Sequence, residues 1–201
     1  MKRDSQAFGR LWRLIALSAL SSVLLSGLPS NAGDPEPTAV LRLRYWQAPT
    51  VLNPHLTTGN KDQEACRLTY EPLASFDAQG RLVPFLAAEI PSFENGGVAP
   101  DGRSVTWRLK AGLKWSDGHP VTAEDIRFTY DFIVDPEVQS LSKGGYAGIQ
   151  TVATLDDLTV RIVFKDRSPF WAVPFVGVRG MVLPRHIFEK YPAAEVRSAP
   201  E

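Results

Sequence analysis

The chain has 201 residues, and its 22 basic side chains are balanced by 22 acidic ones, so the formal net charge is zero. That balance argues against nucleic acid or an anionic membrane surface as the main partner, since both attract strongly basic chains. Cys66 is the single cysteine, which excludes an intrachain disulfide. We expect Cys66 to be a small buried apolar residue.

The first 32 residues have the order of a secretory leader. Basic residues between Lys2 and Arg13 precede an apolar run from Leu14 to Leu25, and Ser30-Asn31-Ala32 offers a small-x-small cleavage site. The apolar run is about a dozen residues long, short of the roughly 20 needed to span a bilayer. We therefore predict a signal peptide over residues 1–32, cleaved after Ala32, with a retained signal anchor as the alternative. No cysteine follows the run, so a lipoprotein is not expected, and removal of the leader changes the formal net charge to −3.

The next segments are a short spacer and the first elements of the domain. Residues 33–39 are rich in proline and acidic residues, and the domain portion is expected over 40–201. Val40 to Trp46 alternates apolar and polar residues, which predicts a first strand. Asp62 to Tyr70 is expected to form a short helix that ends before Pro72.

Three further stretches carry hairpin or strand patterns. "LASFDAQGRLVPF" places two short apolar runs around a D-A-Q-G turn, which predicts a hairpin. Ser104 to Lys110 alternates cleanly, with Val105, Trp107 and Leu109 on one face, and predicts a half-buried strand. "IQTVATLDDLTVRIVF" predicts a second hairpin that turns at Asp156-Asp157. Near the C-terminal end, "GMVLPRHIFEKY" predicts a short strand followed by a helix that Pro184 begins.

The stretch "LKWSDGHPVTAEDIRFTY", from Leu113 to Tyr130, admits two interpretations. In the structural one, Asp117-Gly118 makes a tight turn and Thr122 with Asp125 forms a capping box for a helix that Asp135-Pro136 ends. In the functional one, Asp117 or His119 would pair with Glu124 in a metal or acid/base site. His119 and Glu124 are five residues apart across a proline, which matches no helical ligand spacing. The pattern therefore favours a strand, a turn and a capped helix.

Four segments in order carry a family resemblance: "LRLRYWQAPTVLNPH", "TYEPLASFDAQGRLVPFLAAEI", "SVTWRLKAGLKWSDGHPVTAEDIRFTYDFI" and "DDLTVRIVF". This series resembles the N-terminal part of the family 5 bacterial extracellular solute-binding proteins, the receptors of peptide, nickel and opine ABC importers. The run "LKWSDGHPVTAEDI" is close to the signature of that family. The resemblance covers roughly Val40 to Tyr191, nearly all of the domain portion.

The resemblance implies an α/β fold, the N-terminal portion of a two-lobed periplasmic-binding-protein-like (type II) architecture with lobe I incomplete. It implies a periplasmic receptor that captures an oligopeptide or similar small solute and delivers it to ABC permease subunits in the inner membrane. No enzyme activity, no cofactor, no metal and no nucleic-acid partner are implied. Because the matched part is only the first portion of the family domain, we expect a fragment whose unpaired sheet edges leave apolar surface exposed.

Two places are candidates for lining the ligand cleft. In peptide-binding relatives the segment that matches Trp46, Gln47, Ala48 and Pro49 runs beside the bound peptide and offers backbone hydrogen bonds, a form of strand addition. Pro49 departs from that use, because it has no N–H to donate. The second place is "SKGGYAGI", where Tyr146 offers an aromatic face with a hydroxyl. A surface turn at either place, or a core position for Trp46, is the competing interpretation.

Two other functions stay open at this point. A secreted hydrolase would use Asp117, Glu124 or Asp125, since two carboxylates can share acid and base roles when their pKa values are split. A truncated lobe that binds no ligand could dock on a membrane partner. Of the remaining histidines, His55 is expected to be a surface or turn residue. His186 begins the last helix and has no ligand-spaced partner in the sequence.

Overall fold

The computed structural model describes residues 42–193, 195 and 196. The predicted signal peptide, its cleavage site and the spacer lie outside the described residues. The chain divides into two compact units at the bond between Arg44 and Tyr45. All named helices and strands belong to the second unit, which is described below.

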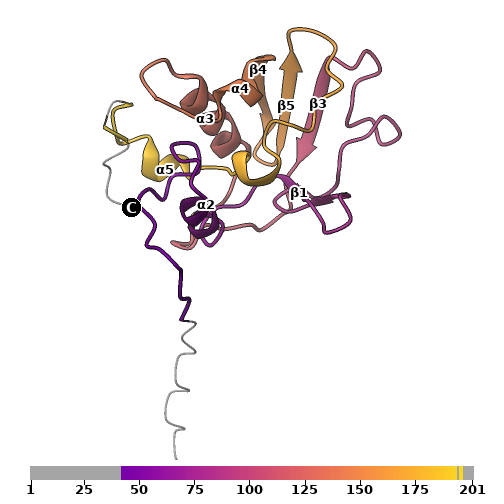
Figure 1. Ribbon diagram of the computed structural model, residues 1–201. Coiled ribbons are helices and arrows are strands. Elements are labelled where there is room, and N and C mark those ends of the chain that lie inside the picture. The colour runs from indigo at the N-terminus through magenta and orange to yellow at the C-terminus, as the bar shows by residue number, and fades with distance from the viewer. Residues whose placement is uncertain (1–41, 194, 197–201) are drawn as a thin grey trace, which may run out of the picture. The chain divides into compact units, whose positions relative to one another are not determined.

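A three-stranded antiparallel sheet is the centre of this unit (Figure 1). It consists of β3 (Ser104–Arg108), β4 (Ile149–Asp156) and β5 (Thr159–Phe164) in the order β3-β5-β4. Val105 pairs with Ile162 and Trp107 with Val160, and these four side chains are buried on one face. The alternation of these strands in the sequence predicted this buried face, which is confirmed.

The predicted β4–β5 hairpin is present, but its turn is Asp157-Leu158, one residue after the predicted Asp156-Asp157. The backbone N–H of Leu158 donates to Asp156 Oδ1 at 2.9 Å, so the turn is closed by a side chain that the turn itself supplies. The second predicted hairpin is β1 (Ala74–Phe76) with β2 (Leu82–Pro84). There Asp77 accepts from the backbone N–H of Arg81, and Gly80 takes a φ of +76° that the turn requires.

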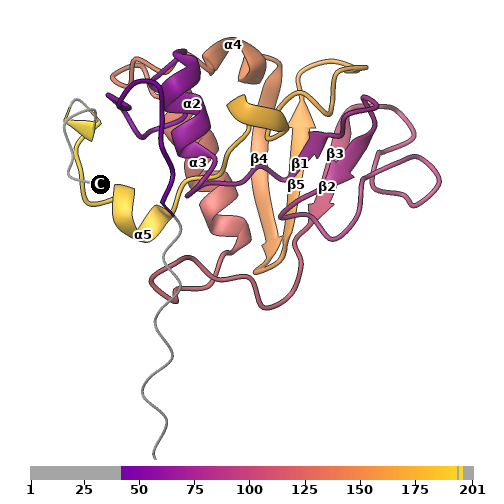
Figure 2. The same ribbon diagram turned by 60° about the horizontal axis from the view of Figure 1, so that its bottom comes forward.

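The main helix, α3 (Ala123–Val134), packs against β4 and β5. Figures 1 and 2 show it next to β4, with β3 at the far edge of the sheet. Its predicted capping box is present: the backbone N–H of Thr122 donates to the Asp125 carboxylate at 2.8 Å. The helix ends at Asp135, before Pro136, as the sequence predicted.

Short helices complete the unit. They are α2 (Asn60–Cys66), α4 (Lys143–Tyr146), the 3-10 turn η1 (Gly177–Arg179) and α5 (Arg185–Phe188). The helix expected from Asp62 to Tyr70 is present, but it begins at Asn60 and already ends at Cys66. The chain continues in turns after Cys66. Pro184 precedes α5 as expected. None of the described helices is long and apolar enough to cross a bilayer.

Two strand predictions are wrong. Residues 42–46 of the first predicted strand have no strand structure, and Leu43 and Trp46 are exposed. An alternating sequence becomes a strand only where a neighbouring strand satisfies its backbone, and none of the described residues does so here. The strand expected just before Pro184 is reduced to a single bridge between Met181 and Pro72.

The core joins the sheet, α3 and the segments that follow β5. Its largest fully buried side chains include Trp107, Phe175, Ile126 and Ile133, and Cys66 is buried as expected. Trp171 packs on Trp107 with ring centroids 6.0 Å apart. His55 lies in a turn, as expected, but it is fully buried in the core and not at the surface. Its two ring nitrogens lie 3.0 Å from Ser142 Oγ and 2.8 Å from the Met181 carbonyl, so the local turn pattern did not show its long-range partners.

Candidate functional site

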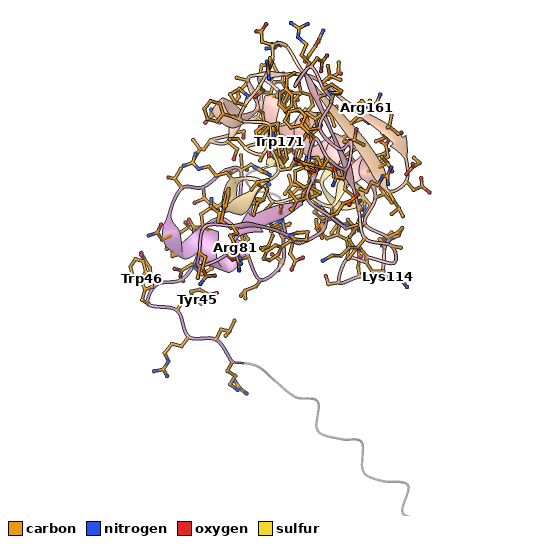
Figure 3. The ribbon with its side chains drawn as sticks, turned by 90° about the vertical axis from the view of Figure 1, so that its right-hand side faces the viewer. Tyr45, Trp46, Arg81, Lys114, Arg161 and Trp171 are labelled. Atoms are coloured by element: carbon orange, nitrogen blue, oxygen red, sulfur yellow. The ribbon has the colours of Figure 1, made fainter. Side chains whose placement is uncertain are left out.

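The predicted segment Trp46–Pro49 lies at the surface, where the second unit begins. Figure 3 shows Trp46 at the edge of the body, where this residue is 74% exposed, whereas Tyr45 is half-buried. The C-terminal end of the segment is held on α2, because Lys61 Nζ donates to the Ala48 carbonyl at 2.9 Å. An exposed indole next to an anchored backbone is a suitable contact for a bound solute.

A buried carboxylate, Asp62, fixes Thr50, the residue that follows this segment. Asp62 is 4% exposed and accepts from the backbone N–H of Thr50 at 2.7 Å and from the Thr57 hydroxyl at 2.8 Å. Burial works to raise the pKa of Asp62, but the hydrogen bonds from Thr50 and Thr57 and the charge of Lys61 outweigh it and lower the pKa. The ionised Asp62 therefore holds the segment against the start of α2.

Tyr146 does not offer the exposed aromatic face that the sequence predicted, because the residue is buried. It is 2% exposed, and its ring meets Phe175 edge-on at 5.1 Å. Its hydroxyl donates to the Arg179 carbonyl at 3.3 Å and accepts from the Phe175 N–H at 3.1 Å. Burial raises the pKa of the phenol, so it stays neutral and keeps its proton for the carbonyl.

The segment that Tyr146 holds has a tightly wound backbone. Phe175 has a φ of +61°, a conformation that bulky residues rarely adopt. A Cβ on Gly180 would lie 2.0 Å from the backbone nitrogen of Val176, so only glycine fits there. Backbone strain of this kind persists where surrounding contacts determine it, and here Tyr146 and the buried Phe175 ring provide those contacts. Tyr146 is thus a positioning residue for η1.

A groove of about 290 Å³ lies between α2 and η1. It is lined by Asn60, Gln63 and Glu64 of α2, by Thr58 and Arg67 beside that helix, and by Val178 and Arg179 of η1. One wall belongs to the helix that anchors the Ala48 carbonyl, and the other to the turn that Tyr146 positions. The two candidate places from the sequence, Trp46–Pro49 and Tyr146, therefore contact the two walls of the same groove. The sequence did not predict this groove.

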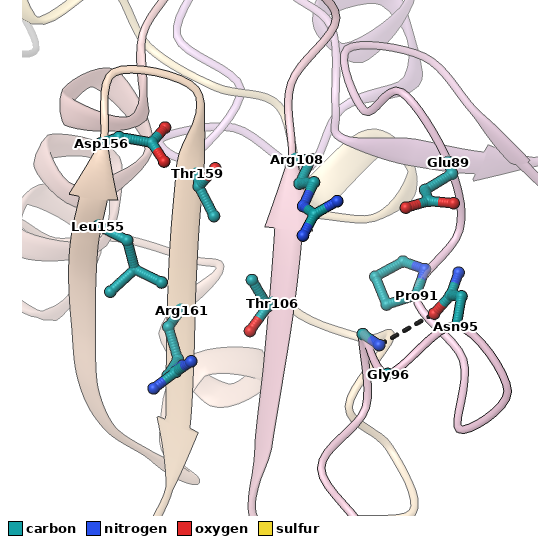
Figure 4. Close-up of a pocket in the computed structure, with 11 residues that line it drawn as sticks. Glu89, Pro91, Asn95, Gly96, Thr106, Arg108, Leu155, Asp156, Thr159 and Arg161 are labelled. Carbon is teal, nitrogen blue, oxygen red and sulfur yellow. Dashed lines mark hydrogen bonds between the residues drawn. The ribbon is translucent and has the colours of Figure 1, made fainter.

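A second hollow, of about 310 Å³, lies over the open face of the sheet. Figure 4 shows Arg108 and Arg161 on the strands and Glu89 on the loop opposite. Asn95 shapes that loop, because its side-chain oxygen accepts from the Gly97 N–H at 2.9 Å. The hollow lies on the polar side of the alternation in β3 and β5, where Thr106, Arg108 and Arg161 line it. The sequence predicted β3 only as a half-buried strand.

The carboxylates of the hydrolase interpretation are all occupied by structural partners. Asp125 caps α3, and Glu124 forms an ion pair with Arg127 at 2.8 Å. The hydrogen bond from Arg127 lowers the pKa of Glu124, and the hydrogen bond from His186 lowers that of Asp117 to about 2. Both pKa values move in the same direction, whereas an acid/base pair needs them pushed apart.

A cluster that sequence reasoning missed joins the turn before α3 to the start of α5. Asp117 Oδ2 is 2.6 Å from His186 Nε2 and 3.2 Å from His119 Nδ1. The two imidazole rings stack with centroids 4.1 Å apart. No local signal could have found this cluster, because His186 lies 69 residues after Asp117.

Comparison with known proteins decides the family. The model of the bacterial extracellular solute-binding proteins, family 5 Middle, matches residues 81–198. The chain belongs to this family. The prediction from the four sequence segments is therefore confirmed.

Relatives of the family agree with this assignment. The oligopeptide-binding protein OppA of Bacillus subtilis is 27% identical over 76% of this chain. The periplasmic oligopeptide-binding protein OppA of Escherichia coli is 27% identical over 89% of it. Among solved structures, OppA of Haemophilus influenzae in complex with the peptide RPPGFSPFR superposes with a TM-score of 0.63, at 26% identity over 74% of this chain.

These relatives are longer than this chain. The chain covers 30% and 34% of the two OppA sequences and 31% of the solved structure. Its elements therefore correspond to part of a type II periplasmic-binding-protein fold, of the α/β class that the sequence predicted.

Proposed function

We propose that this protein is a periplasmic receptor that captures an oligopeptide and delivers it to the permease of an ABC importer. The observation that carries the proposal is the match to the peptide-bound OppA of Haemophilus influenzae, at 26% identity over 74% of this chain. Two relatives described as oligopeptide-binding proteins support the same ligand class. Residues 1–32 would direct export and be cleaved after Ala32, and residues 33–39 would link the leader to the binding portion.

The ligand contacts in this chain would come from Trp46, Gln47, Ala48 and Pro49. Trp46 offers an exposed ring on which a peptide side chain can pack, and Lys61 and Asp62 hold the backbone beside it. The groove between α2 and η1 lies on the same helix, and Arg67, Arg179 and Glu64 supply charges of both signs for peptide termini. Tyr146 would act indirectly, by holding η1.

The direct test is peptide binding by the full chain, purified from the periplasm of an expression host. Thermal-shift screening with peptides of three to nine residues should find a ligand, and titration should then report the affinity. Replacing Trp46 with Ala should weaken binding by roughly thirtyfold if the ring is a central contact. Phe170→Ala is the matched control, because that ring is equally exposed, at 71%, on a different loop.

Two results would contradict the proposal. The first is the absence of a thermal shift with any peptide, opine, sugar or metal chelate. The second, specific to the site, is equal loss of affinity in Trp46→Ala and Phe170→Ala. Sequencing the N-terminus of the periplasmic product checks the cleavage after Ala32 independently. If the protein delivers peptide to a permease, a host that needs the imported peptide for growth should lose peptide uptake when the gene of this protein is deleted.

A further inference from the structure

Two of the three histidines of the protein meet on the surface beside one carboxylate. Each residue of the Asp117, His119 and His186 cluster presents one potential ligand atom, and these three atoms lie within 4.8 Å of one another. The third histidine, His55, is buried with both ring nitrogens bonded. Any binding of a metal ion through imidazole must therefore take place at this cluster.

The fold holds the two halves of the cluster in place. The turn that carries Asp117 and His119 is closed by a bond from the Trp115 N–H to the His119 carbonyl at 2.8 Å, and Gly118 takes a φ of +91° within it. The helix that carries His186 begins where the Arg185 N–H donates to Asp125 Oδ1 at 2.9 Å.

Asp125 connects both parts, because its other oxygen accepts from the Trp115 indole at 3.4 Å and caps α3. This buried carboxylate fixes the turn and α5 relative to each other. The cluster is therefore a preorganised feature of the fold rather than a chance meeting of mobile side chains.

Two of the three distances between ligand atoms are close to what a metal ion requires, and all three are within 4.8 Å. Bonds of about 2.0–2.1 Å to nitrogen and oxygen in a tetrahedral site separate ligand atoms by about 3.3 Å. The His119–Asp117 distance of 3.2 Å already meets this, and the His186–Asp117 pair at 2.6 Å must open slightly. The side chains have room to do so, since they are 59% (His119), 39% (Asp117) and 25% (His186) exposed.

The chemistry of the donor set selects the kind of ion. Imidazole nitrogens suit zinc, copper and nickel, whereas calcium and magnesium require oxygen ligands. Asp117 adds a carboxylate oxygen, a ligand that zinc also accepts beside imidazole nitrogens. Its Oδ1 is held by the His119 N–H at 3.1 Å, which leaves Oδ2 directed at the two imidazoles.

We propose that Asp117, His119 and His186 form a binding site for a divalent transition-metal ion of the zinc class, with water completing the coordination. The ion would join the turn before α3 to α5 and so stabilise the fold locally. The site is independent of peptide capture, because it shares no residue with Trp46–Pro49 or with the groove between α2 and η1.

The test uses the full chain purified without a histidine tag and stripped with EDTA. Titration with Zn²⁺ should show one ion bound per chain. Co²⁺ should bind at the same place and give the visible absorption of a site with nitrogen ligands, and Zn²⁺ should displace it. At a hundredfold excess of Zn²⁺ over the dissociation constant the melting temperature should rise by roughly 5 °C or more. Ca²⁺ and Mg²⁺ should produce neither signal.

Variants locate the site. His119→Ala and Asp117→Asn should each reduce the Zn²⁺ affinity by more than roughly tenfold, since loss of even an outer-shell partner costs that much. Asp166→Asn is the matched control, because Asp166 is a 92% exposed carboxylate with only a 3.8 Å ion pair to Arg103. Its affinity for Zn²⁺ should be unchanged. Absence of Zn²⁺ binding overturns the proposal, and so does full binding by the double variant H119A/H186A that still melts cooperatively.

Discussion

His55 and the His119–His186 pair show the same side chain in opposite environments. His55 is 0% exposed, and its ring bonds to Ser142 and Met181, segments far from it in the sequence. The carbonyl of Met181 can only accept, so Nε2 carries the proton and Nδ1 accepts from the Ser142 hydroxyl. His119 and His186 instead lie on the surface around one carboxylate.

The difference teaches where a polar side chain contributes to stability and where it remains available for a ligand. A buried polar group whose partners are all protein atoms is costly to remove, because those partners would be left without hydrogen bonds. An exposed group exchanges its partners with water at little cost. The burial of each histidine, and not the residue type, decides which role it has.

Replacing His55 with Ala should have the largest effect. The substitution leaves a cavity beside Phe132, whose ring lies 6.4 Å away, and deprives Ser142 and Met181 of their partner. We expect the free energy of unfolding to fall by about 3 kcal/mol or more. Urea denaturation followed by circular dichroism measures it, and a loss below about 1 kcal/mol would show that the buried hydrogen bonds contribute little.

The pH dependence of stability should show the same buried histidine. Burial lowers the pKa of His55 from 6.5 to about 4, against the opposing effect of the Met181 carbonyl. The unfolded chain therefore binds a proton between pH 6.5 and 4 that the folded chain does not, so stability is lost as the pH falls through this window. We expect a loss approaching about 3 kcal/mol by pH 4.

Urea midpoints between pH 7.5 and 4.5 would measure this slope, with His55→Gln as the non-titrating comparison. The carboxylates with lowered pKa values, among them Asp62 and Glu124, lose their stabilising contribution mainly at lower pH, because that loss begins only as the pH falls through their unfolded-state pKa values of 3.8 and 4.5. An identical slope in the variant and the parent between pH 6.5 and 4.5 would exclude His55 as its source.

The same comparison explains what the sequence could and could not predict. The strand pattern of Ser104–Arg108, the β4–β5 hairpin and the Thr122–Asp125 capping box depend on residues close in the chain, and all three are confirmed. The burial of His55 depends on Met181, 126 residues away, and no local pattern contains it. The cluster around Asp117 was missed for the same reason, because its nearest nitrogen belongs to a helix that follows the whole sheet.

For the candidate site, the sequence suggested the segment Trp46–Pro49 but not the contacts that hold it in place. Trp46–Pro49 was predicted by resemblance, while its anchoring through Lys61 and Asp62 requires the position of α2 in three dimensions. Tyr146 was predicted to face a ligand because Gly144-Gly145 would allow close approach of the backbone and the tyrosine would offer an aromatic face with a hydroxyl. Its burial follows from the turn at Phe175, whose φ of +61° no propensity of phenylalanine would predict.

Replacing His119 with Ala should have the smallest effect, although it removes the same side chain as the His55 substitution. The imidazole of His119 is 59% exposed, and its removal leaves the 2.6 Å hydrogen bond between His186 and Asp117 in place. In EDTA we expect the free energy of unfolding to change by no more than about 0.5 kcal/mol, measured by urea denaturation with an unchanged slope. Because a metal ion stabilises only the state that binds it, the gap between parent and variant should widen when Zn²⁺ replaces EDTA. A large loss in EDTA would mean that the stacked rings are themselves structural, and a gap that stays the same with Zn²⁺ would mean that His119 is no ligand.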